Sequence, residues 1–228
     1  MTRLERKLNV KRLFIDATMT IIQEEGLEEV SIRKVAKITG YNSATLYTYF
    51  KNLDHLILLA SMKFLNEYIT GLDAYTAKAE NPLEESILIW EFFCKCSFKK
   101  PEIYKSIFFS NLDFNRKDFE NYYEIKEFYK IYPEEITNSF AKFHRMILKL
   151  DIYERNKILL IKMARKKFIS PSNITSLNDM QVLIYKGLLE EATKPENRYR
   201  HKVLCNRAIK YIKNCYKLYI LDECRLLK

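Results

Sequence analysis

The feature that most constrains the fold is the run SIRKVAKITGYNSATLYTYF, residues 31–50, which predicts two short helices joined by one tight turn. Ser31 is placed to cap the first helix, because its hydroxyl can accept a hydrogen bond from a free backbone N–H. Gly40 supplies the left-handed residue that ends this helix. Asn42 caps the second helix in the same way as Ser31 caps the first. Both helices are therefore specified by their local sequence.

The second of these helices has one apolar face and one small, polar face. At about 100° per residue, Tyr49 and Phe50 fall within about 60° of Leu46, so this face is expected to pack. Small residues and hydroxyl groups on the other side let a helix approach base edges in the major groove of DNA. These residues are Ser43, Ala44, Thr45, Tyr47 and Thr48. We therefore predict that residues 42–49 form a recognition helix.

The region from Ala17 to Leu56 contains three recognisable motifs. They are I-x-x-x-G at Ile22–Gly26, VAKITG at Val35–Gly40 and TLYTYF at Thr45–Phe50. With these motifs the region resembles the N-terminal DNA-binding domain of TetR/AcrR-type bacterial transcriptional regulators. The resemblance implies a helix-turn-helix that binds double-stranded DNA, followed by a helical ligand-binding and dimerisation domain.

Three positions depart from the pattern of that family. The small apolar residue that usually follows the turn glycine is Tyr41, and the glycine usual in the recognition helix is Ala44. The lysine that the family generally carries at the start of the fourth helix, where it grips a phosphate, is Leu53. We expect Lys51, two residues earlier, to take over that phosphate contact.

The predicted DNA contacts come from both helices and from the residue just after them. Thr45, Tyr47 and Thr48 are expected to contact bases or phosphates. A second group is expected to position the DNA backbone: Ser31, Arg33, Lys34, Tyr49 and Lys51. Arg33 and Lys34 lie in the first turn of their helix, where the helix dipole disfavours cations. That cost suggests a phosphate nearby, with solvated surface charge as the alternative.

The net charge of +10 is distributed unevenly along the chain. Residues 1–51 hold nine Lys and Arg against six Asp and Glu, whereas residues 194–228 hold ten against three. The basic excess is therefore largest at the end away from the predicted helix-turn-helix. Local placement favours DNA binding nevertheless, since five cations are positioned to lie along phosphates: Arg3, Arg6, Lys7, Lys11 and Arg12.

Several classes of protein are disfavoured by what the sequence lacks. No run of about 18 apolar residues occurs, so we expect no contact with a membrane and a cytoplasmic location. The five cysteines lack C-x-x-C spacing and predict buried thiols in a reducing compartment instead of a metal site; they are Cys94, Cys96, Cys205, Cys215 and Cys224. Glycine-rich phosphate loops and catalytic motifs are also missing. We expect neither a cofactor nor an enzyme.

Apolar residues at helical spacing predict an all-α protein of two domains. Residues 1–52 are expected to form the helix-turn-helix domain, and residues 53–228 a larger helical domain for ligand binding and dimerisation. Helices are predicted at about 10–25, 52–75 and 152–168. Pro101 and Pro133 are expected to open further helices.

Aromatic residues are concentrated in the stretch 83–150, which is otherwise helical in pattern. Such density favours an apolar cavity for a small apolar or aromatic effector, whereas plain core packing is the alternative for any one ring. The expected cavity residues are Trp90, Phe93, Tyr104, Phe108, Tyr123 and Phe140.

The last two helices, predicted at about 177–192 and 198–226, are expected to form a homodimer. A glycine inside a helix costs about 1 kcal/mol relative to alanine, and close approach of another helix would offset that cost. The predicted interface contains Leu183, Gly187, Leu204, Ala208 and Tyr211. A two-fold dimer would place two recognition helices about 34–36 Å apart, or a multiple of that spacing.

Two functions from different classes fit this sequence. The first is a ligand-responsive DNA-binding regulator, expected to repress from a palindromic operator and to be released by its effector. The second is a helical lipid-binding or membrane-surface protein, whose aromatic middle holds an acyl chain and whose basic C-terminal helix lies on anionic headgroups. The second explains residues 83–228 equally well. It gives no purpose to the twice-capped element at 31–50, so the first is preferred.

Overall fold

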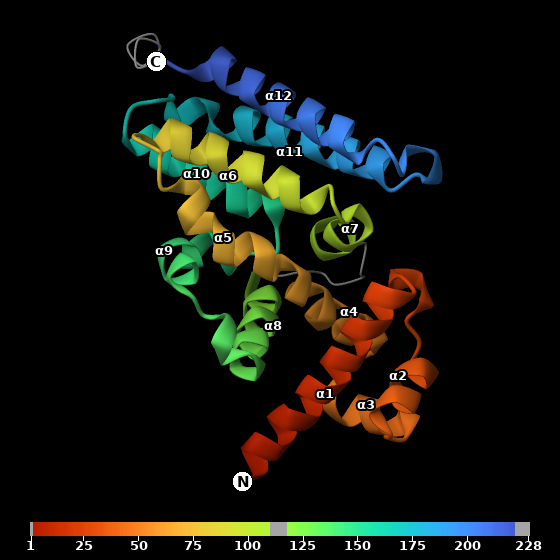
Figure 1. Ribbon diagram of the computed structural model, residues 1–228. Helices are drawn as coiled ribbons and strands as arrows, with labels where there is room; N and C mark the ends of the chain where they lie inside the picture. The colour runs from red at the N-terminus through yellow and green to blue at the C-terminus, as the bar shows by residue number, and fades with distance from the viewer. Residues whose placement is uncertain (1, 110–117, 222–228) are drawn as a thin grey trace. The chain divides into compact units, whose positions relative to one another are not determined.

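The regular secondary structure of the described part of the chain is helical (Figure 1). The computed structural model describes the backbone of residues 2–109 and 118–221, and the side chains of the same ranges except residues 118–122. In these ranges no strand occurs, and one isolated antiparallel bridge joins Ile169 and Ile220. The all-α fold predicted from the sequence is confirmed. Contacts divide the chain into an N-terminal unit, residues 1–66 and 110–137, and a C-terminal unit, residues 67–109 and 138–228.

The N-terminal unit contains the helix-turn-helix and three further helices, and the first helix of the unit contacts all the others. Its helices are α1 (Arg3–Glu24), α2 (Ile32–Thr39), α3 (Ser43–Tyr49), α4 (Leu53–Met62) and α8 (Asp118–Ile131), with short 3₁₀ turns at Leu27–Glu29, Lys63–Leu65 and Pro133–Glu135. Helix α1 contacts α2, α3, α4 and α8. Its buried side chains, among them Phe14, Ile15 and Ile21, recur at helical spacing and supply the core of this unit.

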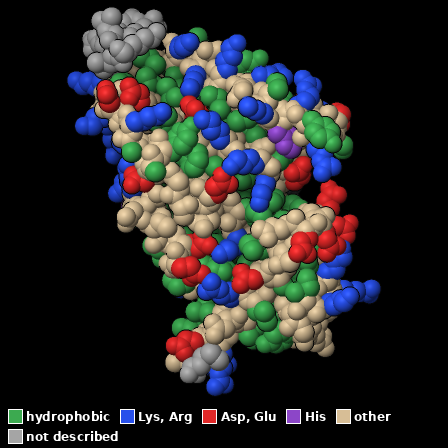
Figure 2. Space-filling model, viewed as in Figure 1, with side chains coloured by type: hydrophobic (Ala, Val, Ile, Leu, Met, Phe, Trp, Pro, Cys, Tyr) green, Lys and Arg blue, Asp and Glu red, His purple; other side chains and the backbone are tan. Residues whose placement is uncertain are grey.

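The C-terminal unit is a helical bundle, and four of its helices form a central group in which each helix packs against two others. Its helices are α5 (Asn66–Thr76), α6 (Pro82–Ser97), α7 (Pro101–Phe109), α9 (Asn138–Ile147), α10 (Ile152–Arg165), α11 (Ile174–Ala192) and α12 (His201–Tyr219). Helix α11 packs against both α10 and α12, and α6 packs against the same two helices. Short 3₁₀ turns lie at Pro171–Asn173 and Pro195–Asn197. Lys and Arg side chains gather along α12 on the face shown in Figure 2.

Helix boundaries differ from the sequence expectations at three places. Helix α1 begins at Arg3 instead of about residue 10, because Thr2 and Glu5 form a capping box. The long helix expected at 52–75 is interrupted by the 3₁₀ turn at Lys63–Leu65. Pro133 opens only a 3₁₀ turn, and the next helix begins at Asn138. Of the last helix, expected up to residue 226, residues 222–226 lie outside the described residues.

The two compact units do not coincide with the division expected at residue 52. Helix α4 and the distant helix α8 both pack on α1, so the unit that contains the helix-turn-helix includes residues from two separated stretches of sequence. A functional division at residue 52 stays a prediction.

Four cysteines lie in the core of the C-terminal unit. Cys94, Cys96, Cys205 and Cys215 are buried free thiols, whereas Cys224 lies outside the described residues. Burial raises the pKa of Cys96 to about 12 and that of Cys205 to about 11, which keeps these thiols protonated. Within the described ranges, no group of three or more His, Cys, Asp or Glu side chains is arranged to hold a metal ion. None of the described helices combines the length and apolar character that a membrane crossing needs.

Candidate DNA-binding site

The caps predicted for the helix-turn-helix are present. The Ser31 hydroxyl accepts from the Lys34 backbone N–H at 3.3 Å, and the Asn42 side chain accepts from the Ala44 N–H at 2.9 Å. Gly40 has a φ of 72°, the left-handed conformation that a residue with a Cβ rarely adopts. These local interactions fix where α2 ends and where α3 begins.

The packed face of α3 is held by one ring from α1. Leu46 is fully buried and Phe50 nearly so. The Phe14 ring lies 5.9 Å from the ring of Phe50, 6.3 Å from that of Tyr49 and 5.5 Å from that of Tyr41, between centroids. Aromatic pairs at such distances stabilise one orientation of the rings. Phe14 therefore contributes to the orientation of α3 on the unit. Tyr49 takes part in this packing and is half-buried, and its contact with DNA stays a prediction.

The opposite face of α3 is open to solvent. Ala44, Tyr47 and Thr48 are exposed, and Tyr47 keeps 57% of its surface accessible. Ser43 and Thr45 are half-buried beside them. The structure therefore presents together the small and hydroxyl-bearing residues that the sequence placed on one side of the helix. Such a surface has the size and the hydrogen-bonding groups needed to approach base edges.

The two cations in the first turn of α2 differ in their surroundings. The Lys34 ammonium lies 2.7 Å from Glu25 and 2.6 Å from Glu29, and these hydrogen bonds raise the pKa of Lys34. The two carboxylates offset the unfavourable helix dipole, so Lys34 needs no phosphate. Arg33 is exposed, and no salt bridge joins it to another residue of the described ranges. Arg33 is therefore the better candidate for a phosphate contact.

Acidic side chains of α8 and the turn after it face several cations that the sequence assigned to phosphates. Lys11 is buried in an ion pair with Glu127, and Arg12 pairs with Glu134. Lys51 lies 3.5 Å from Glu124. These acidic residues are more than 70 positions from their partners in the sequence, so no local sequence pattern predicts the ion pairs. Arg3, Arg6 and Lys7 are exposed and make no salt bridge with described residues.

A buried histidine supports the end of α3. The Nδ1 atom of His55 accepts a hydrogen bond from the Lys51 backbone N–H at 3.2 Å. Burial lowers the pKa of His55 to about 4, opposed by Glu127 and assisted by the charges of Lys11 and Lys51. Near neutral pH the imidazole is therefore uncharged and acts as an acceptor. It holds the backbone that carries the Lys51 side chain.

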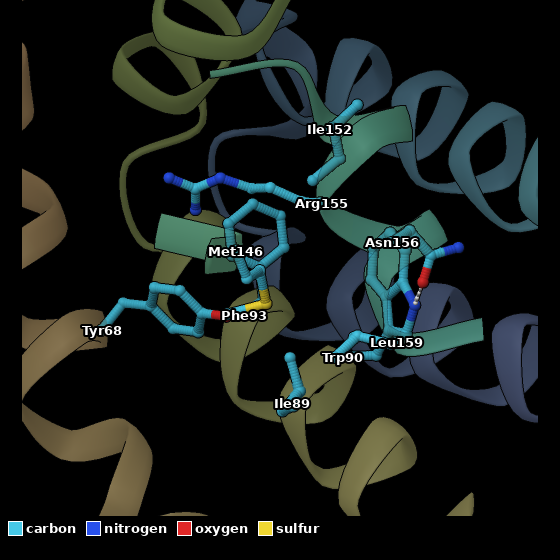
Figure 3. A pocket seen from close by; sticks show the side chains of 9 residues that line it. All are labelled: Tyr68, Ile89, Trp90, Phe93, Met146, Ile152, Arg155, Asn156 and Leu159. Atoms are coloured by element: carbon cyan, nitrogen blue, oxygen red, sulfur yellow. Dashed lines mark hydrogen bonds between the residues drawn. The ribbon is translucent and has the colours of Figure 1, made fainter. Parts of the chain in front are cut away.

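An apolar cavity exists in the C-terminal unit, but it is small. It measures about 20 Å³, which is room for about one water molecule. Tyr68, Ile89, Trp90, Phe93, Met146, Ile152, Arg155, Asn156 and Leu159 line it (Figure 3). The Trp90 indole N–H donates to the Asn156 side-chain oxygen at 2.8 Å across one side.

Four of the six aromatic residues expected to line an effector cavity are in contact with one another, but they do not enclose a large cavity. Only Trp90 and Phe93 border the cavity. Tyr104 and Phe108 are buried and pack edge-on against Phe93, at 5.7 and 5.4 Å between centroids, so they fill core space. Phe140 is half-buried and does not border it. Tyr123 is 67% exposed on α8 and belongs to the N-terminal unit.

The residues expected at a dimer interface divide into two groups. Leu204 and Ala208 are buried within the single chain, so the α12 stripe that contains them packs internally instead of facing a partner. Leu183 and Tyr211 are exposed, as is Gly187, where a Cβ atom would meet no atom of the described residues within 4 Å. Two apolar residues that sequence reasoning missed, Val203 and Leu218, are also exposed on α12.

A capped helix-turn-helix with an exposed polar face, followed in the sequence by a larger helical unit, is the architecture found in DNA-binding transcription regulators. Residues 14–60 match the model of bacterial regulatory proteins of the tetR family, which confirms the resemblance drawn from the motifs. The match ends within α4. The similarity to that family therefore covers the helix-turn-helix and parts of α1 and α4.

Solved structures extend the similarity to the rest of the fold. A tetR-family transcriptional regulator from Mesorhizobium loti is 15% identical, with a TM-score of 0.54, over 97% of this chain and 100% of that one. The fatty acid degradation regulator FadR from Bacillus halodurans is 14% identical, with a TM-score of 0.51, over 89% and 93%. At such identities the likeness shows the fold alone: that of a tetR-family transcription regulator. No curated protein matches this chain.

Proposed function

We propose that the protein is a transcriptional repressor that occupies a palindromic operator as a homodimer through α3. The observation that carries this proposal is the exposed face of Ala44, Tyr47 and Thr48, on a helix whose other face is fixed by Phe14. Occupation of an operator is sufficient for repression, so the proposal assigns no catalytic group and no cofactor to the protein.

The DNA contacts of the proposal follow the structure. Tyr47, Thr48 and Thr45 reach bases or phosphates, with Ala44 and Ser43 allowing close approach. Arg33 is the first candidate for a phosphate contact because it is exposed in the first turn of α2 without a carboxylate partner among the described residues. Ser31 contributes as the cap of α2, whereas Lys34 and Lys51 would have to exchange their carboxylates for phosphate.

A genomic pull-down tests the DNA-binding part of the proposal. The parent protein is expected to retain specific fragments of duplex DNA, and affinity for a recovered fragment should fall steeply with salt, by about 0.9 log units per phosphate contact per log of salt. Tyr47→Ala and Arg33→Gln should each weaken binding, with the second also reducing the salt slope. Lys202→Gln, an equal charge change on the exposed surface of α12, is the control. Unchanged binding by both α3 and α2 variants would show that another surface holds the DNA.

The dimer part of the proposal rests on the exposed apolar residues of α11 and α12. Leu183 of α11 and three residues of α12, Val203, Tyr211 and Leu218, are exposed apolar side chains, and a Cβ atom at Gly187 would meet no described atom within 4 Å. Burial of such residues against their own symmetry mates is favourable at about 25 cal/mol per Å². Gly187→Arg should yield monomers in sedimentation, since the arginine fits the free chain but not a close helix crossing. Asn206→Arg, which places the same charge at an exposed position of the other helix, α12, is the control. A Gly187→Arg protein that remains a dimer would place the interface elsewhere.

The last part of the proposed function is a small apolar or aromatic effector that releases the protein from DNA. The cavity beside Trp90 and Phe93 has too little space for a drug-sized molecule, which needs about 300 Å³ or more. Binding of a small apolar or aromatic effector there requires movement of cavity side chains, of which Met146 is the most adaptable. Titration of Trp90 fluorescence with planar aromatic compounds tests this part. Absence of any saturable response would remove the effector from this cavity and leave the DNA-binding part unaffected.

A further inference from the structure

A large surface groove lies between α9 and α10 of the C-terminal unit, and none of its lining residues belongs to α11 or α12. It measures about 620 Å³, within the range of about 300–1,000 Å³ that is usual for small-molecule sites. Its residues come from α9, from α10 with the residue that follows it, and from the first turn of α6.

The rim of the groove is strongly cationic. Five lysine and arginine side chains border it, against the single carboxylate of Glu85. Lys162 pairs with Glu85, and Lys142 lies 2.7 Å from Asp73. The remaining three, Arg145, Arg165 and Lys166, are exposed and form no salt bridge with any residue that the structure describes. They leave a local positive charge that an anionic group would neutralise.

The floor of the groove is apolar. Phe143, Met146 and Leu159 are buried beneath it, and Ile158 and Ile161 are half-buried along it. A plain anion such as phosphate makes no use of this floor, and a neutral apolar compound makes no use of the three cations. The combination fits a molecule with one anionic head and one alkyl chain.

We infer that this groove binds a single-chain anionic amphiphile, with its carboxylate or phosphate head at Arg145, Arg165 and Lys166 and its alkyl chain on the apolar floor. The occupant is a free monomer and not a bilayer, because the apolar side chains line a hollow instead of protruding. Membrane-surface helices instead present their apolar residues outward.

The groove and the inner cavity share two lining residues. Binding in the groove can therefore be followed by the fluorescence of Trp90, which lines the cavity. Met146 and Leu159 border both spaces, so they form the wall between the alkyl chain and Trp90. Methionine adapts readily to a new neighbour. An alkyl chain on this wall therefore changes the surroundings of the chain's only tryptophan.

A hydrogen-bonded route leads from this wall to the proposed dimer helix. Asn156, one turn before Leu159 on α10, donates to Asn178 and Gln181 of α11, each at 2.9 Å. Gly187 lies further along α11. A regulatory effect of the amphiphile along this route rests on the proposed function, whereas binding in the groove does not.

The experiment titrates the full-length protein, without DNA, with dodecanoate below its micelle concentration. Saturable binding of one molecule per chain and a change in Trp90 emission are expected. Dodecyltrimethylammonium, which has the same chain and the opposite charge, should not saturate the site, and inorganic phosphate alone should leave the emission unchanged. Octanoate should bind roughly tenfold or more weakly, because four methylene groups are lost from the floor.

Paired variants separate the groove from general surface charge. Arg145→Gln with Arg165→Gln should weaken dodecanoate binding about tenfold or more, as expected when charge-assisted contacts are lost. Lys210→Gln with Lys217→Gln removes the same charge from a different hollow, near α6 and α12, and should leave affinity unchanged. Equal loss in both pairs, or equal binding of the cationic chain, would overturn the inference. Binding to phosphatidylglycerol vesicles without binding of monomers would overturn it in favour of a membrane surface. Since no arm contains DNA, failure here leaves the proposed DNA binding standing.

Discussion

Four cations of the N-terminal unit and those of the groove between α9 and α10 differ in whether a carboxylate faces them. Lys11, Arg12, Lys51 and Lys63 each face a carboxylate from residues 124–135. In the groove, Glu85 and Asp73 form salt bridges with two of the five cations. The other three cations form no salt bridge with a carboxylate of the described residues.

This difference separates cations that hold a fold together from cations that are available to a ligand. In the N-terminal unit the buried Tyr132 ring lies 4.8 Å from the Arg12 guanidinium and 4.1 Å from the Lys63 ammonium, and its hydroxyl donates to Asp16 at 2.7 Å. Burial raises the pKa of Tyr132, with the hydrogen bond to Asp16 adding to the effect, so the phenol stays protonated. Removing a member of such a cluster should cost stability, whereas removing a groove cation should cost only ligand affinity.

The largest expected effect is that of Tyr132→Ala. Loss of a fully buried ring should destabilise the protein by about 3–5 kcal/mol, because both the apolar contacts and a cavity term are involved. Urea denaturation followed by circular dichroism measures this. Tyr132→Phe keeps the ring and loses only the hydroxyl bond, so about 0.5–1.5 kcal/mol is expected. If Tyr132→Ala and Tyr132→Phe lower the free energy of unfolding by the same small amount, the cluster around Tyr132 does not stabilise the protein.

The next effect depends on pH and concerns His55. Its pKa is about 4 when folded and 6.5 in an unfolded chain, so the unfolded state takes up the proton first. The stability contributed by the neutral imidazole is complete above pH 6.5. It is lost as the pH falls towards 4, by at most about 3 kcal/mol. His55→Asn keeps an acceptor and should lack this part of the pH dependence, as judged by urea denaturation between pH 7 and 4. Parallel curves for parent and variant would contradict the buried, neutral state.

A smaller effect is expected when the ion pair of Lys51 with Glu124 is removed. Glu124→Gln removes the carboxylate 3.5 Å from its ammonium and should tighten DNA binding about two- to fivefold, with a salt slope steeper by up to about 0.9. The control is Glu67→Gln, which removes the partner of Lys99 in the C-terminal unit. Weaker binding by Glu124→Gln would show that this ion pair positions α3 instead of competing with phosphate.

The smallest effect is expected for Arg145→Gln on stability. An exposed side chain without a carboxylate partner among described residues should change the free energy of unfolding by no more than about 0.5 kcal/mol. The same urea denaturation measures it, with Lys11→Gln as the contrasting substitution of a buried, paired cation. A loss for Arg145→Gln as large as that for Lys11→Gln would erase the distinction between the two sets of cations.

The parts of the site that depend on neighbouring residues were predictable from the sequence. Ser31, Gly40 and Asn42 act within their own turns, and the buried face of Leu46 follows from helical period. Interactions that join distant segments left no local signal. The pairs of Lys11 with Glu127 and of Lys51 with Glu124 join residues more than 70 positions apart, so the lysines were assigned to phosphates instead.

Periodicity also did not show which neighbour covers a buried stripe. Leu204 and Ala208 lie on an apolar stripe that α12 buries within the chain, while the exposed apolar residues Val203 and Leu218 lie outside it. In the same way, ring density does not distinguish a cavity wall from filled core. Tyr104 and Phe108 pack against Phe93, and little space remains.

The participation of α8 in the N-terminal unit has a consequence for the order of folding. The ion-pair partners of α1 and α4 lie between residues 124 and 135, so the unit cannot be completed until the ribosome has released that stretch. Closing so long a loop slows folding, because chain entropy must be lost before the contacts form. A nascent chain that stops at residue 66 has α1 to α4 but lacks the carboxylates that face Lys11 and Lys63. The helix-turn-helix is therefore translated first, but the unit that contains it completes its folding only after residues 124–135 have been synthesised.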